Sequence, residues 1–171
     1  PIDKTSKLIQ PRKLHATQWG YMCPCETPEG ASIGVVKNLS MLATITSDID
    51  TNEIMGILKD MDNVVPFIDT HITPTVLRDG VLIHVNGQYA GVTSQPYEVV
   101  NCIRELRRHG LVHPHTSIGF MVSQKEIYIH TEAGRVTRIL MILENGKHRC
   151  TPQTLQRLRE HSISWSELLL G

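Results

Sequence analysis

The side chains best suited to chemistry lie near the start of the chain. Five of them could contact phosphate or carboxylate groups, namely Arg12, Lys13, His15, Lys37 and Asn38, and Glu29 adds a carboxylate nearby. A guanidinium offers two parallel donors to such a group, and an imidazole can change its charge near neutral pH. From residue types alone, Arg12 and Lys13 are interpreted as a surface basic pair. His15 is equally typical of a structural residue, and Lys37 and Asn38 could contact phosphate or cap the loop.

Two carboxylates, Glu26 and Glu29, flank the dipeptide Thr27-Pro28. Such a pair suggests general acid–base catalysis or magnesium binding. A metal site needs carboxylates that converge on one point, and the proline between these two favours divergent directions. We therefore assign neither glutamate as a metal ligand or as a catalytic acid or base.

The four cysteines do not form a zinc pattern, because only Cys23 and Cys25 are close and no second pair follows, the others being Cys102 and Cys150. Reduced structural thiols are the favoured interpretation. A thiol nucleophile at Cys23 or Cys25 with His15 as its base is the rival enzyme hypothesis. Pro24 disfavours it, because neither a helix N-terminus nor a fixed base is evident.

The segment from His15 to Gly34 is predicted to be an ordered loop. Its turn-forming residues exclude a regular helix or long strand: Gly20, Pro24, Pro28, Gly30 and Gly34. Interleaved apolar residues such as Trp19, Tyr21 and Met22 distinguish it from a soft linker, since they need a surface to pack against.

This loop resembles the fork region in the second-largest subunit of multisubunit DNA-directed RNA polymerases. The resemblance is carried by Pro11-Arg-Lys-Leu-His15, Gln18-Trp-Gly20, Cys23-Pro24, Glu26-Thr-Pro-Glu-Gly30 and Gly34-Val-Val-Lys-Asn-Leu-Ser40. Gln18 departs from the family pattern, which usually has histidine there, so no charged imidazole is available at that position. Later segments are similar, in order, to the external domains that follow the fork: Val85–Gly91, Leu106–Gly110, Glu126–Arg135 and Trp165–Leu169. The overall form is closer to eukaryotic, archaeal or large-DNA-virus enzymes than to bacterial ones.

The resemblance implies roles for individual residues. Arg12 matches the fork arginine near the active centre and the incoming nucleotide, and Lys13 and His15 lie beside it. Glu29 matches a glutamate that would orient basic groups next to the active centre. Lys37 and Asn38 would lie near nucleic acid.

The function implied is DNA-templated RNA synthesis from ribonucleoside triphosphates. Two Mg²⁺ ions would act in a site shared with the largest subunit, which supplies the metal-binding aspartates, so this chain should not catalyse anything alone. The implied partners are the largest and other subunits, the DNA template and the RNA product. The alternative is a non-enzymatic interaction module that binds a polymerase subunit or a transcription regulator.

Composition is that of an ordinary globular chain of 171 residues, 40% hydrophobic and 20% charged, with a formal net charge of zero. The charge is uneven: residues 1–40 hold five basic and three acidic residues, and residues 41–80 hold two and seven. A polyanion site must therefore be local or completed by other chains. No apolar run reaches the roughly 20 residues that span a bilayer, and no signal peptide is evident. We expect an intracellular protein, in nucleus, cytoplasm or virion according to source, with no membrane partner.

The predicted fold is α+β and β-rich, with a loop-rich fork segment followed by a small antiparallel sheet and a few short helices. Residues 1–46 are predicted to end the fork region, and residues 47–171 to form external domains that continue beyond the C-terminus. The abrupt polar start and the apolar run that ends the chain suggest a fragment. The expected strands are a buried region at 35–36 and 39–45, a hairpin at 81–85 and 88–92, and strands at 117–122, 126–130 and 135–143.

Four helices are expected. An amphipathic helix begins near Thr51, and the clearest helix follows Gln95 and stops at Gly110. Others begin after Thr151 and at Leu168. On the clearest helix Arg104, Arg107 and Arg108 are interpreted as a solvated face that complements the helix dipole, with phosphate binding as the alternative. Nearby His109, His113 and His115 favour a polar turn over a metal site, because Gly110 and Pro114 break any common helical face.

Overall fold

The computed structural model describes residues 7–67 and 73–170. The chain divides into two compact units: unit 1 comprises Pro1–Ile45 and Arg135–Ile139, and unit 2 comprises Thr46–Gly134 and Leu140–Gly171. No sequence pattern predicted that residues 135–139 belong with the first 45 residues. The predicted division into a fork end at 1–46 and external domains at 47–171 stays a prediction.

Unit 1 consists mostly of loop. Its short 3-10 helices are η1 (Gln10–Arg12), η2 (Ala16–Gln18) and η3 (Gly30–Ser32). Strand β1 (Ala43–Ile45) pairs antiparallel with β7 (Val136–Arg138). Among the residues described for this unit, no hydrophobic side chain is buried.

The prediction of a buried strand region at 35–36 and 39–45 is wrong. Only Ala43–Ile45 is a strand, Val35 and Val36 lie outside it, and Met41 is 100% exposed. Apolar, β-branched residues are typical of buried strands, but burial requires a second layer of side chains, and the described part of unit 1 supplies none.

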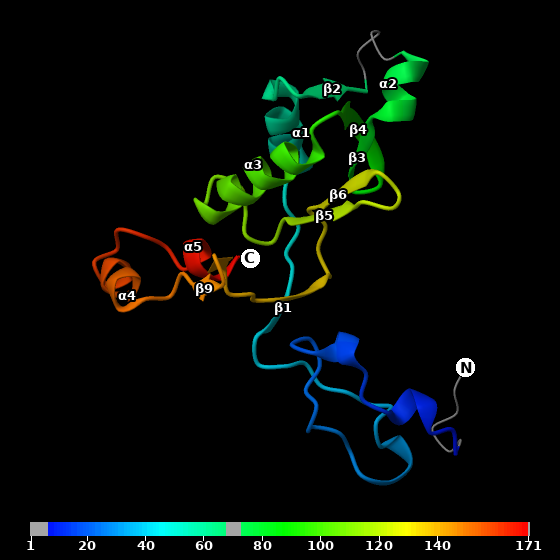
Figure 1. The fold of residues 1–171 in the computed structure, drawn as a ribbon. Helices are drawn as coiled ribbons and strands as arrows, with labels where there is room; N and C mark the ends of the chain where they lie inside the picture. Colours follow the sequence, from blue (N-terminus) through cyan, green and yellow to red (C-terminus); the bar gives the residue numbers. More distant parts are fainter. Residues whose placement is uncertain (1–6, 68–72, 171) are drawn as a thin grey trace. The chain divides into compact units, whose positions relative to one another are not determined.

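Unit 2 is built on a five-stranded sheet with the order β2-β4-β3-β6-β5 (Figure 1). The strands are β2 (Val64–Pro66), β3 (Val81–Val85), β4 (Gln88–Thr93), β5 (Ser117–Met121) and β6 (Glu126–His130). The predicted hairpin is confirmed: β3 and β4 are antiparallel, and Asn86 and Gly87 take φ values of 50° and 78° in the turn between them. Positive φ at both positions is what a two-residue hairpin turn needs.

The sheet is mixed, which corrects the expectation of a purely antiparallel one. Strands β3 and β6 are parallel, with Ile83 opposite Ile127. After β4 the chain crosses through a helix to β5, and the β5–β6 hairpin returns β6 to the side of β3. Turn signals fix only sequence neighbours, so this distant pairing could not be read from them. The α+β class itself is confirmed.

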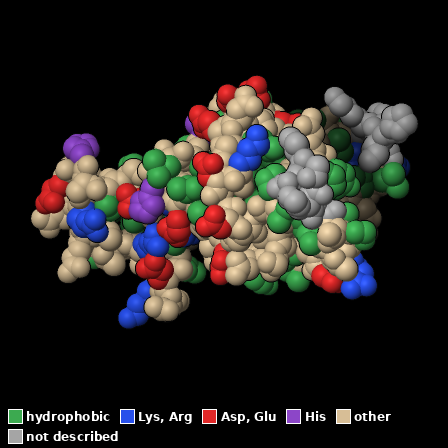
Figure 2. Space-filling model, turned by 90° about the horizontal axis from the view of Figure 1, so that it is seen from above, with side chains coloured by type: hydrophobic (Ala, Val, Ile, Leu, Met, Phe, Trp, Pro, Cys, Tyr) green, Lys and Arg blue, Asp and Glu red, His purple; other side chains and the backbone are tan. Residues whose placement is uncertain are grey.

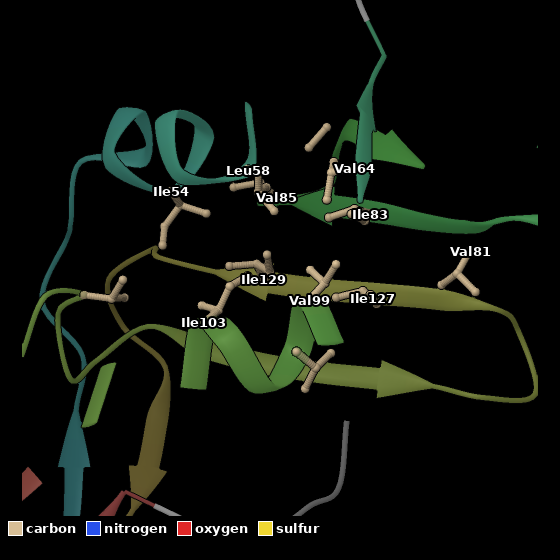
Figure 3. Packing of buried hydrophobic residues seen from close by; sticks show 13 residues of the cluster. Ile54, Leu58, Val64, Val81, Ile83, Val85, Val99, Ile103, Ile127 and Ile129 are labelled. Atoms are coloured by element: carbon tan, nitrogen blue, oxygen red, sulfur yellow. The ribbon is translucent and has the colours of Figure 1, made fainter. Parts of the chain in front are cut away.

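Helices α1 (Thr51–Asp60) and α3 (Pro96–Arg108) pack on one face of this sheet and close the core. Figure 3 shows Ile54 and Leu58 of α1 and Val99 and Ile103 of α3 pointing toward the isoleucines of β3 and β6. Four isoleucines have no exposed surface: Ile83, Ile103, Ile127 and Ile129. Both helices begin where the sequence predicted, at Thr51 and at Pro96, and the Asp50 side chain caps the first of them.

The arginines of α3 do not form a solvated face, contrary to the prediction. Arg107 is buried and donates from Nη1 to the carbonyl oxygen of Thr116 at 2.8 Å. Burial, and then the neighbouring charges of Arg104 and Arg108, lowers the pKa of Arg107 from its usual value. Arg108 pairs with Glu105 and donates to the carbonyl of Leu170 at 3.0 Å. These two side chains connect α3 to the backbone at Thr116 and at Leu170.

The predicted strand over 135–143 is broken in two, because Val136–Arg138 joins unit 1 while β8 (Leu143–Glu144) pairs with β9 (Lys147–His148) in unit 2. Helix α4 (Pro152–Arg159) begins after Thr151 as predicted, and Thr151 caps it. Helix α5 (Ser166–Leu169) begins two residues before the expected start at Leu168. Helix α2 (Pro74–Asp79) was not predicted, although Thr73 caps it and Pro74 opens it.

The face of the molecule in Figure 2 shows acidic and basic side chains interspersed, with no single basic patch. Within residues 7–67 and 73–170, no helix has the length and apolar character needed to cross a membrane.

Candidate functional site

The loop of unit 1 is organised around the side chain of Arg12. Its Nε donates to the carbonyl oxygen of Leu8 at 3.1 Å, and its Nη1 donates to the carbonyl oxygens of Ala31 and Ile33 at 2.8 and 2.9 Å. Arg12 ends η1, whereas Ala31 and Ile33 lie in and just after η3. The guanidinium therefore holds two parts of the loop together that are about 20 residues apart in sequence.

Gly34 allows the loop backbone to pass directly against Arg12. A Cβ atom at this position would lie 2.3 Å from the Arg12 carbonyl oxygen and 2.8 Å from its Cα, and φ is +70°. Both the space and the left-handed backbone require glycine. On the other side, Lys37 donates from Nζ to the carbonyl oxygen of Gly34 at 2.6 Å.

Thr27 and Asn38 connect residues 23–27 to the exit of the loop, residues 34–38. The Thr27 hydroxyl accepts from the amide of Gly34 at 2.8 Å and donates to the carbonyl oxygen of Val36 at 3.1 Å. The Asn38 carbonyl oxygen accepts from the amide of Cys23 at 2.8 Å, and its side-chain amide donates to the carbonyl oxygen of Glu26 at 3.4 Å. Asn38 and Lys37 thus cap the loop, which was one of the two roles open to them.

His15 is an exposed residue that caps η2. Its Nδ1 lies 2.7 Å from the Thr17 hydroxyl and accepts from the Thr17 amide at 3.3 Å. An Nδ1 that accepts from a backbone amide carries no proton, so the neutral ring is protonated on Nε2. His15 therefore orders the local turn.

Lys13 and Glu29 are exposed. Lys13 directly follows η1 as its C-cap residue, and Glu29 precedes η3, where its side chain makes no capping hydrogen bond. The structure thus brings Arg12, Lys37 and Asn38 into one hydrogen-bonded loop, and leaves the charged groups of Lys13 and Glu29 on its surface.

The residues do not form a metal site. Over the described ranges, no three His, Cys, Asp or Glu side chains gather where they could hold an ion. Cys23 and Cys25 are free thiols, and the Nδ1 of His15 is engaged with Thr17, so nothing in the loop supports the thiol-nucleophile hypothesis.

Two segments of the chain, one that contains this loop and one that contains strands β4, β5 and β6, match known protein families. Residues 1–45 match the family described as RNA polymerase Rpb2, domain 3, and residues 83–144 match RNA polymerase Rpb2, domain 4. The chain belongs to the family of second-largest subunits of DNA-directed RNA polymerases. The two matches occur in the order that the motifs predicted.

Three relatives illustrate the similarity of this Rpb2-type chain. The DNA-directed RNA polymerase II subunit RPB2 of Meyerozyma guilliermondii is 37% identical over 94% of the chain, and that of Encephalitozoon cuniculi is 34% identical over 99%. The DNA-directed RNA polymerase III subunit RPC2 of Drosophila melanogaster is 32% identical over 99%. The chain spans only 13%, 14% and 15% of these relatives.

One residue that contacts the Rpb2-type loop from outside was missed by sequence reasoning. Arg138, in β7, donates from Nη1 to the carbonyl oxygen of Trp19 and lies over the ring of Tyr21, 119 residues away from Trp19 in sequence. The sequence carried no signal for this contact, since an arginine in a short strand is usually a surface residue. Only the β1–β7 pairing brings it to the loop.

Replacing Thr27 by valine should loosen the loop exit of this Rpb2-type chain. Valine has the shape of threonine but cannot bridge the Gly34 amide and the Val36 carbonyl. We expect a loss of about 0.5–1.5 kcal/mol of local stability and faster hydrogen exchange at the Gly34 amide. Ser32→Ala is the control, because no hydrogen bond from that hydroxyl supports the exit, and equal exchange in the two variants would contradict the bridging role.

Proposed function

We propose that this chain is part of a DNA-directed RNA polymerase, in which unit 1 lines the active centre for templated RNA synthesis from ribonucleoside triphosphates. The proposal is supported above all by the match of residues 1–45 to Rpb2 domain 3, the segment that contains the ordered loop. The relatives are named as subunits of DNA-directed RNA polymerases. That this chain takes part in RNA synthesis is inferred from those names and is part of the proposal. The DNA template, the RNA product and the largest subunit are its proposed partners.

Within this proposal some of the candidate residues hold the loop backbone in place, and others present exposed polar groups. Arg12 acts through the loop backbone that it holds, since its Nε and Nη1 are directed at carbonyl oxygens. Lys13, His15 and Glu29 present exposed polar groups near the proposed active centre, where Lys13 would attract phosphate and Glu29 would orient basic groups. Lys37 and Asn38 fix the exit of the loop near the nucleic acid.

Magnesium ligands are proposed to lie outside this chain. Glu26 and Glu29 are both exposed, and no further carboxylate, histidine or cysteine among the described residues completes a site with them. The metal chemistry of nucleotidyl transfer would then be supplied by the largest subunit. This chain contributes the shape and polarity of the surrounding wall.

The decisive experiment substitutes Arg12 in the assembled enzyme. Arg12→Ala removes the donors to Ala31 and Ile33, and the single-nucleotide addition rate is expected to fall on the order of tenfold or more while assembly survives; tenfold corresponds to about 1.4 kcal/mol in the barrier. Arg12→Lys is the matched variant, because it keeps the charge and loses the planar fork, and it should restore only part of the rate.

Rapid-quench extension of a preformed template–RNA scaffold measures the addition rate, and native gel filtration of the complex measures assembly. A normal addition rate in the complexes that do form, with a reduced yield of assembled complex, would contradict the active-centre role. That result would favour the non-enzymatic interaction module in its place.

A further inference from the structure

Arg138 contacts three consecutive residues of the loop. Its Nη1 donates to the carbonyl oxygen of Trp19 at 2.5 Å, and its guanidinium carbon lies 5.0 Å from the centroid of the Tyr21 ring. Between these two residues, a Cβ atom on Gly20 would lie 2.8 Å from Cδ of Arg138. Gly20 therefore leaves the space that lets the arginine approach this closely.

These contacts lie between two candidate site residues. Trp19 follows η2, the turn that His15 caps, and its amide donates to the carbonyl oxygen of Ala16 at 3.1 Å. Tyr21 accepts from the amide of Ser40 at 3.0 Å, next to the Cys23–Asn38 hydrogen bond. A group that holds Trp19 and Tyr21 in place therefore also holds two neighbouring parts of the loop. These are the end of the turn that His15 caps and the backbone hydrogen bonds beside Asn38.

The contacts use properties that are specific to arginine. One edge of a guanidinium can donate to a carbonyl oxygen while its flat face lies on an aromatic ring. Lysine keeps the charge but offers no planar face, and methionine keeps length and apolar contact but offers no donor. These differences allow the two kinds of contact to be separated by substitution.

We propose that Arg138 is a positioning residue, which holds the Trp19–Tyr21 segment so that His15 and Asn38 keep their places in the loop. The inference rests on the proposed function for its catalytic consequence. Arg138 belongs to the segment that matches Rpb2 domain 4, whereas the loop belongs to the segment that matches domain 3. The geometry of the loop therefore depends on a residue from the following domain of the sequence.

The first test measures loop order by hydrogen exchange and mass spectrometry on the assembled enzyme. Arg138→Met is expected to speed exchange by tenfold or more in a peptide spanning residues 16–23. Thr137→Val is the matched control, because the Thr137 hydroxyl bonds to Thr44 in the same strand pair, at 2.8 Å between hydroxyls, and not to residues 16–23. It should leave the exchange of residues 16–23 unchanged.

A second variant approaches the same contact from the loop. Tyr21→Leu removes the ring under the guanidinium and leaves Arg138 in place, so it should also speed exchange at residues 16–23, by a smaller factor. If Arg138→Met does not fold, this variant and Arg138→Lys carry the test. Unchanged exchange in the folded variants would overturn the positioning role, whatever the enzyme does.

The second test is single-nucleotide addition. Arg138→Met should lower kcat/KM for the nucleotide on the order of tenfold, Arg138→Lys should restore it only partly, and Thr137→Val should have no effect. If Arg12→Ala slows addition and Arg138→Met does not, the inference fails while the proposed function stands. If neither slows addition, the proposed function fails, and the catalytic consequence of Arg138 fails with it.

Discussion

Gly34→Ala is expected to disrupt the candidate site more than any other single-methyl change in the loop. The new Cβ would lie 2.3 Å from the Arg12 carbonyl oxygen, and backbone atoms cannot rotate away as a side chain can. A left-handed φ of +70° adds about 1–2 kcal/mol for a residue with a Cβ. Because the Arg12 backbone must move, its hydrogen bonds to Ala31 and Ile33 should be lost with it.

The measurement combines hydrogen exchange over residues 27–36 with the nucleotide addition rate of the assembled enzyme. We expect exchange to approach that of an unstructured loop and addition to fall by at least tenfold. Gly30→Ala is the matched control, because Gly30 also has a positive φ, +76°, but a Cβ there meets no atom within 4 Å. Gly30→Ala should show only the cost of placing a residue with a Cβ at positive φ. An equal effect of both substitutions would refute the argument that a Cβ at Gly34 clashes with the Arg12 backbone.

Ile129→Ala is expected to have the largest effect on the stability of unit 2. Ile129 is fully buried in β6, in the cluster that joins β3 and β6 with α1 and α3. Truncation removes three buried carbons and leaves a cavity that the packed helices can fill only partly, which costs about 2–5 kcal/mol. The free energy of unfolding from urea denaturation should fall by this amount.

Met121→Ala serves as the comparison, since Met121 lies in the neighbouring strand β5 and is 48% exposed. Its removal should change the free energy of unfolding by less than about 1 kcal/mol. If Ile129→Ala also cost less than that, the packing of β6 described above would be wrong.

The sequence predicted features that depend on near neighbours. The hairpin around Asn86-Gly87 and helix α3 after Pro96 form where their signals lie, because a positive φ or a fixed proline φ is a property of the residue itself. The ordered loop was likewise predicted from its glycines and prolines. Residue motifs also indicated the polymerase family, which the comparisons confirmed.

Distant pairing was not predictable in the same way. The parallel contact of β3 with β6, the return of residues 135–139 to unit 1 and the burial of Arg107 all join segments whose partners are not encoded nearby. For the apolar residues at 39–45, hydrophobicity predicted burial, but burial depends on what else packs there.

The candidate site shows the same division. By itself the sequence determined that His15 and Glu29 lie in one ordered loop, with Arg12 just ahead of it and Asn38 at its exit, because turn residues constrain the local backbone. Only the tertiary structure decided that Arg12 faces the carbonyl oxygens of Ala31 and Ile33 and that Arg138 holds Trp19. Hydrogen bonds between distant residues depend on where the whole chain places donor and acceptor, and no short stretch of sequence contains that information.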